Sequence, residues 1–205
     1  MNDADSHAEE YQRLRPLLFS IAYNMTGSVA DAEDIVSEAF LRLHRAHADG
    51  TVIASMKSYL STVVSRLSIS HLAEHFFAAV ETGDLDGLVD LLAADVVTYG
   101  DGGGRGPSLP KPVYGRDKAL RLLAALSTAL RRYHLHLERG TVNAQPGALV
   151  RDASGALLNV LSVDVFGGRV QTIHSILNPD KLGHLGPLAG PDHPLRRGAR
   201  HTRPE

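Results

Sequence analysis

Cysteine and tryptophan are both absent from this sequence of 205 residues. The lack of cysteine excludes a disulfide-stabilised scaffold, a thiolate metal site and a cysteine nucleophile. No apolar run approaches the roughly 18 residues that a membrane span needs, and the polar N-terminus MNDADSHAEE is unlike a signal peptide. We therefore expect a soluble cytoplasmic protein with no membrane partner.

A large excess of either charge is also missing, because 21 Lys and Arg stand against 23 Asp and Glu. Residues 1–70 contain six basic and nine acidic side chains, so this half is the more acidic one. A protein that holds nucleic acid by bulk charge needs a basic surface. Autonomous DNA binding by residues 1–70 is therefore not expected. The chain is 43% hydrophobic, which is enough to bury a core.

Residues 11–70 are predicted to be purely helical, with three amphipathic helices. Gly27 and Ser28 separate the first two, and Asp49-Gly50 marks a turn before a third helix that starts near Ser55. Apolar residues recur at helical spacing in each of the three. They are Leu14, Leu17, Leu18, Ile21, Ala22 and Met25, then Ala32, Ile35, Val36, Ala39, Phe40 and Leu43, and then Met56, Tyr59, Leu60, Val63, Val64 and Leu67.

Residues 71–186 are predicted to form an α+β domain, with helices first and an antiparallel meander after them. A helix is expected to stop at Thr82-Gly83, and a Gly- and Pro-rich loop covers 102–115. The predicted strands are 96–99, 133–138, 142–145, 148–151, 157–165 and 169–177, and the other helices are 84–92 and 116–132. Residues 1–10 and the basic tail 187–205 are expected to be disordered. No linker separates the halves, since Ser68 to His71 joins them directly.

The first half resembles region 2 of the extracytoplasmic-function sigma factors of bacterial RNA polymerase. The residues that carry this resemblance are YQRLRPLLFSIAYNMTGSVADAEDIVSEAFLRLHRA (11–46) and SYLSTVVSRLSIS (58–70), with GSVADAEDIVSEAFLRL (27–43) the most specific segment. The resemblance implies a three-helix bundle over 11–70 that binds core polymerase and the −10 promoter element.

The second half resembles a SnoaL-like domain of the nuclear-transport-factor-2-like cone fold, over 71–186. The carrying residues are FFAAVETGDLDGLVDLLAADVVTYGDGGGR (76–105), QPGALVRD (145–152) and NPDKLGHLGP (178–187). Together the halves resemble SigJ-type sigma factors, whose fold would here be a helical bundle joined to helices on a curved antiparallel sheet. Such factors carry region 4, which reads the −35 element, between these halves. Here Ser70 passes almost directly into the SnoaL-like helix, so region 4 is missing.

Four acidic residues of the second predicted helix are candidates for polymerase binding. The resemblance implies that this helix docks on the clamp helices of the β′ subunit, where carboxylates could pair with arginine. The plain alternative is that acids in a first helical turn favour the positive end of the helix dipole. The four residues are Asp31, Glu33, Asp34 and Glu38.

A second set of residues is a candidate for contact with promoter DNA. By position, the loop 46–55 corresponds to the segment that holds a flipped −10 base, and capture of a base needs base-edge hydrogen bonds. The basic residues nearby could contact phosphates, although an ordinary loop between helices is the alternative. The candidates are His47, Asp49 and Thr51 for the base, and Arg42, Arg45, Lys57 and Arg66 for phosphates.

The cone fold suggests a cavity, and five residues are candidates for it: Tyr99, Asp101, His134, His136 and Asn178. Strand alternation places the first two on one face and the two histidines on one face. The second candidate function is therefore a small-molecule-binding protein or an acid/base enzyme of the cyclase or isomerase kind, with an Asp–His pair at work. The alternative is that both histidines face solvent.

Three further features each have a functional and a plain structural interpretation. The string His71-Leu72-Ala73-Glu74-His75 matches an inverted zinc-peptidase motif, but a solvent-facing helix explains it better, so no metal and no cofactor is expected.

The resemblance implies that the SnoaL-like domain regulates the sigma domain, through Asp101, Gly102, Gly103, Gly104 and Arg105 and through Asn178, Pro179, Asp180, Lys181 and Leu182. The first segment could form an anion nest, and turn chemistry explains the second equally well. Homodimerisation through the sheet is a third reading.

Overall fold

The computed structural model describes residues 3–104 and 109–196, with side chains from residue 10 onward. The chain divides into two compact units, with the boundary after Leu72, and each is described by itself. Unit 1 is the helical unit and unit 2 is the α+β unit. Within the described ranges, no helix combines the length and the apolar character that a membrane span requires.

Unit 1 consists of α1 (Asp3–Thr26), α2 (Val29–Ala48) and the first part of α3 (Met56–Thr82). Gly27 adopts a left-handed φ of 69°, and Ser28 accepts a hydrogen bond from the Asp31 amide at the start of α2. Both residues therefore separate the helices as predicted. The helix α1 begins at Asp3, inside the segment 1–10 that was expected to be disordered.

The core of unit 1 follows the predicted helical stripes closely. Leu17 is the exception, because it is 39% exposed and lies on the open side of α1. Tyr11 of α1 packs edge-on against the ring of Phe40 in α2. The fully buried side chains are Leu14, Leu18, Ala22, Ala32, Ile35, Val36, Ala39, Phe40, Leu43, Leu60 and Val64.

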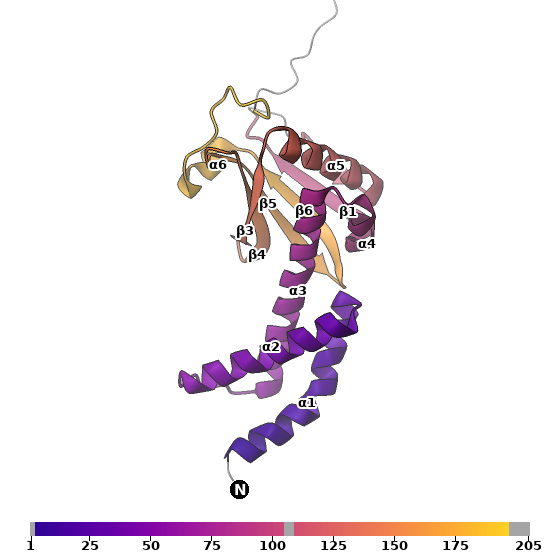
Figure 1. Cartoon of the computed structure of the whole chain (residues 1–205), viewed down its shortest axis with the longest axis vertical. Helices are drawn as coiled ribbons and strands as arrows, with labels where there is room; N and C mark the ends of the chain where they lie inside the picture. Colours follow the sequence, from indigo (N-terminus) through magenta and orange to yellow (C-terminus); the bar gives the residue numbers. More distant parts are fainter. Residues whose placement is uncertain (1–2, 105–108, 197–205) are drawn as a thin grey trace, which may run out of the picture. The chain divides into compact units, whose positions relative to one another are not determined.

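Unit 2 contains the end of α3, three further α-helices, a short 3-10 helix and a six-stranded sheet (Figure 1). The helices are α4 (Leu85–Leu91), α5 (Arg116–Arg132), α6 (Pro179–Leu182) and η1 (Gly183–Leu185). The strands are β1 (Leu92–Asp101), β2 (Val113–Tyr114), β3 (His136–Val142), β4 (Gln145–Arg151), β5 (Leu157–Phe166) and β6 (Arg169–Ile176).

The sheet has the order β2-β1-β6-β5-β4-β3, so β3 to β6 form the predicted antiparallel meander. The strands β1 and β6 are parallel neighbours, with Thr98 opposite Ile173 and Gly100 opposite Ser175. This pairing brings the end of β1 beside the end of β6. Segments that are about 75 positions apart in the sequence therefore meet at one edge.

Both faces of the sheet are covered over β5, which explains its almost continuous apolar sequence. On one face, Phe76 and Phe77 of α3 and Leu123 of α5 share a core with residues of β4, β5 and β6. On the other face, Leu182 of α6 packs against Leu157 and Val160 of β5.

Several boundaries differ from the prediction, and β1 and β3 cover 92–101 and 136–142 where 96–99 and 133–138 were predicted. The helix α3 runs without a break to Thr82, and β2 lies inside the predicted loop 102–115. Residues 142–145 are not a strand, because Asn143 and Ala144 have positive φ and form the turn between β3 and β4. The tail is ordered up to residue 196, since Leu157 exchanges backbone hydrogen bonds with Pro187 and Ala189. Residues 197–205 lie outside the described part.

Candidate functional site

Three acidic side chains of α2 form a stripe on unit 1, and of these three Asp34 is the most exposed. Asp31, Asp34 and Glu38 follow i, i+3, i+7 spacing, which places them on one side of the helix. Asp31 lies 3.3 Å from Nε2 of His71 in α3, and Glu33 lies 3.2 Å from Arg15 in α1. Asp34 is exposed and makes no ion pair with another described side chain. It is therefore the carboxylate most available to a partner.

Glu38 is engaged with two arginines of its own helix. Its carboxylate lies 2.9 Å from Nε of Arg42 and 4.0 Å from Arg45. The hydrogen bond from Arg42 holds the pKa of Glu38 below its usual value, although the group is open to solvent. Exposed pairs of this kind are weak. Both arginines can therefore exchange this contact for a phosphate at little cost.

The predicted DNA-contacting residues lie on α2, on α3 and in the loop between them. Arg42, Arg45, Lys57 and Arg66 are exposed, as are Asp49 and Thr51, whereas His47 is half-buried. Val52 lies at the same loop and is 94% exposed, a residue that the sequence reasoning did not single out. In the sequence, the available signal was a β-branched residue, Val52, inside a predicted loop. It gives this loop an apolar surface beside its polar groups.

The string His71-x-x-Glu74-His75 lies within α3, and its side chains have different neighbours. His71 contacts Asp31, and Glu74 lies 3.3 Å from Arg139 of β3. No group of three or more acidic or histidine side chains in the described ranges is arranged to hold a metal ion. Glu74 therefore contributes to an ion-pair cluster, in which Arg139 also reaches Glu81 at 2.7 Å.

A cavity of about 340 Å³ lies between α5 and the sheet in unit 2. Its apolar wall comes mainly from α5, and its polar groups come from three neighbouring strands, β1, β5 and β6. The lining residues are Thr98, Gly100, Leu109, Leu122, Leu123, Leu126, Asn159, Leu161, Ile173, Ser175 and Leu177. No carboxylate, imidazole or amine is among them.

The five residues predicted to share the cavity, Asn178 included, are not among its described lining residues. Tyr99 and Asp101 do lie on one face of β1, but Thr98 and Gly100 on the opposite face are the ones that reach the cavity. His134 precedes β3 with a positive φ of 51°, and both it and His136 are exposed. The predicted Asp–His acid/base pair therefore does not lie in this cavity, and both histidines face solvent.

The two segments predicted to be regulatory come together at the end of β1. The Asp101 carbonyl accepts hydrogen bonds from the amides of Leu177 and Asn178, and the Asp101 carboxylate lies 2.8 Å from Nζ of Lys181. The Gly103 amide donates to the same carboxylate, so an internal anion already occupies this turn. Asn178 caps α6 by accepting from the Asp180 amide. Arg105 lies outside the described residues.

The Asp101 contacts make a pH-dependent contribution to stability. The hydrogen bond from Lys181, followed by that from the Gly103 amide, holds the pKa of Asp101 below its ordinary value of 3.8. A depressed carboxyl pKa stabilises the fold above the unfolded value and loses this contribution as the pH falls through the folded value.

We expect Asp101→Asn to lower the free energy of unfolding at pH 7 by less than about 1 kcal/mol, because the ion pair is partly exposed. The difference from the parent protein should shrink as the pH falls below about 4. Urea denaturation at pH 7 and pH 3 measures both quantities. A difference that stays constant over this range would contradict the assignment.

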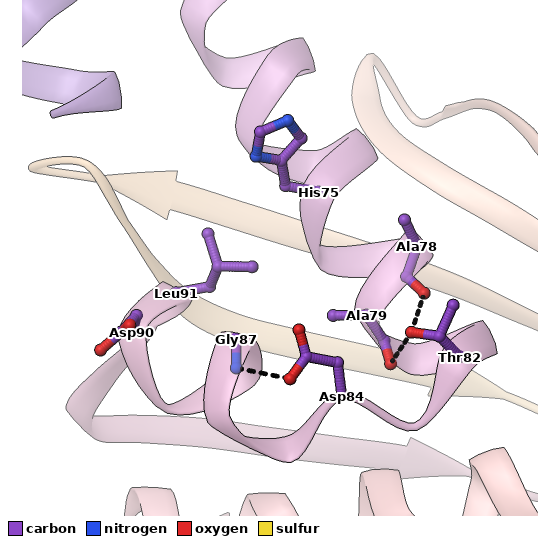
Figure 2. Close-up of a pocket in the computed structure, with 8 residues that line it drawn as sticks. All are labelled: His75, Ala78, Ala79, Thr82, Asp84, Gly87, Asp90 and Leu91. Atoms are coloured by element: carbon purple, nitrogen blue, oxygen red, sulfur yellow. Dashed lines mark hydrogen bonds between the residues drawn. The ribbon is translucent and has the colours of Figure 1, made fainter. Parts of the chain in front are cut away.

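A second hollow, of about 380 Å³, lies between the end of α3 and α4 (Figure 2). His75, Ala78 and Ala79 line it from α3, and Asp90 and Leu91 line it from the end of α4. The Thr82 hydroxyl donates to the carbonyls of Ala78 and Ala79. Asp84 caps α4 through the Gly87 amide. These polar groups therefore serve the helix ends.

The sequence reasoning missed the polar residues of the sheet cavity. Asn159 and Ser175 form a reciprocal side-chain hydrogen bond, with Asn159 Nδ2 3.0 Å from Ser175 Oγ. The hydroxyl of Thr98 is buried and has no hydrogen-bond partner among the described residues. A signal was present, because Asn159 interrupts the apolar run of residues 157–163. A buried polar residue inside such a run needs a reason.

Comparison with known proteins identifies both halves. Residues 10–75 match the Sigma-70 region 2 family, and residues 73–176 match the SnoaL-like domain family. These ranges overlap, so no residues are left between them for another domain. A 63-residue segment is 52% identical to the ECF RNA polymerase sigma factor SigJ of Mycobacterium tuberculosis, and it covers 31% of this chain and 19% of that relative.

Among solved structures, the crystal structure of Mycobacterium tuberculosis SigJ is 24% identical, with a TM-score of 0.48, and covers 89% of this chain and all of that one. An LEH-like epoxide hydrolase from M. tuberculosis is 16% identical, with a TM-score of 0.37, and covers 57% of this chain and 86% of that one. The family matches confirm both predicted resemblances. The chain belongs to the SnoaL-like domain family and carries a sigma-70 region 2, as in sigma factors of the SigJ type, directly before that domain.

Proposed function

We propose that the chain is a sigma-factor-like transcription protein of the cytoplasm. Region 2 binds core RNA polymerase at the clamp helices of the β′ subunit and, once bound, contacts the −10 promoter element. The SnoaL-like domain regulates this binding. The single observation that supports the proposal most is the 52% identity to a sigma factor over 63 residues, which falls within the region 2 match.

The charges of unit 1 support an order of events. Residues 1–70 are acidic overall, and Asp31, Asp34 and Glu38 form one stripe on α2. Such a surface repels DNA phosphates but suits a basic protein partner. Polymerase therefore binds first. Arg42 and Arg45, whose ion pairs among the described side chains are with Glu38 alone, then become available to DNA phosphates.

Recovery of core polymerase by the purified, tagged chain tests the proposal. Asp34→Lys should reduce the recovered polymerase by roughly fivefold or more, because a like charge would face the basic partner at a close contact. Asp34 is the right position because it makes no ion pair with another described side chain, so its reversal leaves the unit 1 contacts intact.

Asp95→Lys is the matched control, since Asp95 is also exposed but lies on β1 of unit 2. This variant carries the same net charge as Asp34→Lys and should recover polymerase like the parent chain. Failure of the parent chain to bind polymerase, or equal loss in both variants, would overturn the proposal. Equal loss would mean that the net charge of the chain, and not the position of Asp34 on α2, determines how much polymerase is recovered.

A further inference from the structure

The helix α5 of unit 2 carries most of that unit's unbalanced positive charge. It contains five basic residues and a single acidic one, Asp117. Residues 73–205 as a whole contain 15 basic and 14 acidic side chains, which nearly cancel. The positive charge of unit 2 is therefore concentrated on one helix, and the rest of the unit is acidic.

Three of these basic side chains lie on one exposed side of α5. Lys118, Arg121 and Arg132 are all exposed, and at 100° per residue they fall within a sector of about 60° around the helix axis. They extend over about 21 Å of the helix. The short, polar or small side chains of Ala125 and Thr128 lie between Arg121 and Arg132 on the same side, so a partner can approach the helix closely there.

The charges of this basic row are not neutralised within the described part of the chain. Lys118, Arg121 and Arg132 form no ion pair with a described side chain. The guanidinium of Arg132 lies 5.4 Å from the centre of the Tyr133 ring, a contact that orients the side chain and keeps its charge. The row therefore presents three positive charges to solvent.

The opposite side of α5 limits the kinds of partner that can bind. Ala119, Leu123 and Leu130 are buried in the core of unit 2, so the helix has no apolar face to insert into a lipid surface. A protein partner usually needs a large apolar or aromatic anchor. None of the exposed large apolar side chains of the described residues belongs to α5.

A nucleic-acid duplex has the properties that this row fits. Its phosphates are bound by lysine and arginine side chains without any apolar anchor, and binding releases the counterions of the duplex. Such contacts carry no sequence information. The helix also has no Asn or Gln with which to recognise an adenine edge.

We infer that the exposed side of α5 binds the phosphate backbone of duplex DNA, independently of sequence, through Lys118, Arg121 and Arg132. This gives the SnoaL-like unit a DNA contact of its own, separate from region 2. The inference concerns α5 alone and does not rest on polymerase binding. A chain that fails to recover polymerase can still bind DNA through α5, and the reverse is also true.

Fluorescence anisotropy of the full chain with two labelled duplexes of about 20 bp and unrelated sequence tests the inference. We expect equal affinity for both duplexes, and a plot of log K against log[NaCl] with a slope of about −3, since each phosphate contact contributes roughly −0.9. No binding of either duplex at about 20 mM NaCl would overturn the inference. A tenfold preference for one sequence would overturn it too.

The double variant Lys118→Gln/Arg121→Gln removes two of the three contacts. It should weaken binding at about 20 mM NaCl by at least tenfold and make the salt slope shallower by about 2. Both side chains are exposed, so the circular dichroism spectrum should match that of the parent chain. An unchanged affinity and slope in this variant would place the DNA contact elsewhere and overturn the inference.

Arg13→Gln/Arg15→Gln is the matched control, because it removes two exposed positive charges from α1 and gives the chain the same net charge. It should bind both duplexes within about twofold of the parent chain. Equal weakening in the two double variants would mean that net charge alone controls binding, and would contradict a site on α5.

An excess of poly-L-glutamate tests whether an acidic protein is the better partner. It should displace the labelled duplex far less than unlabelled duplex does at the same concentration of charge, because a duplex holds one charge per about 1.7 Å of its axis. Equal displacement would mean that the row on α5 binds acidic polypeptides as well as DNA, and would overturn the assignment to DNA.

Discussion

Replacing Gly103 by alanine is expected to lower the free energy of unfolding by about 2 to 3 kcal/mol. Gly103 has a φ of +61°, a region that costs a residue with a Cβ about 1–2 kcal/mol. A Cβ at this position would lie 2.5 Å from Oδ1 of Asn178. Asn178 cannot move aside without breaking the hydrogen bond that it accepts from the Asp180 amide, and this bond caps α6. Loss of the cap therefore adds to the cost.

Gly104→Ala provides the control for backbone strain. Gly104 has a φ of +70°, but a Cβ there would have no atom within 4 Å. This variant should therefore lose only about 1 kcal/mol or slightly more. Urea unfolding followed by circular dichroism suits both variants, since the chain has no tryptophan. Equal losses would mean that Gly103 is not packed against Asn178 as the structure has it.

The helical half of the molecule could be predicted well because its signals are local. The spacing of apolar residues predicted the buried side chains of α2, and Gly27 and Ser28 predicted the break before it. Leu17 was predicted to be buried but is exposed, so apolar spacing alone does not predict every buried residue. Apolar spacing defines a wide stripe, but the packing partner decides which edge of the stripe is buried.

The cavity was predicted on the wrong face of β1 for a physical reason. Strand alternation separates Tyr99 and Asp101 from Thr98 and Gly100, but it does not say which pair points inward. Large and ionisable residues attracted attention as site candidates. In the structure the small residues Thr98 and Gly100 line the cavity, since small side chains are what leave space under α5.

The contact between residues 101–104 and residues 178–181 could not be predicted from either segment. It depends on the parallel pairing of β1 with β6, which places Asp101 opposite Ile176. Each segment by itself has ordinary turn chemistry, with Asp101 bonding the Gly103 amide and Asn178 bonding the Asp180 amide. Only the sheet order joins them, and that order is a long-range property.

Replacing Gly147 by alanine is expected to lower the free energy of unfolding by about 3 kcal/mol. Gly147 lies in β4 between β3 and β5, and a Cβ there would lie 2.6 Å from the backbone oxygen of Leu161. That oxygen belongs to the paired strand β5, so it cannot withdraw without opening the β4–β5 ladder. The Val142 side chain, also 2.6 Å away, blocks a shift toward β3.

Gly140 makes the comparison direct, because it pairs with Gly147 across the β3–β4 ladder. A Cβ at Gly140 would meet no atom within 4 Å. Gly140→Ala should therefore be neutral or stabilise the protein by up to about 1 kcal/mol, since alanine is less flexible than glycine in the unfolded chain. Thermal unfolding of the two variants should differ by roughly 6–12 °C in Tm. A similar Tm in both would mean that β4 lies farther from Leu161 than the structure has it, and that the meander behind the cavity is more loosely packed.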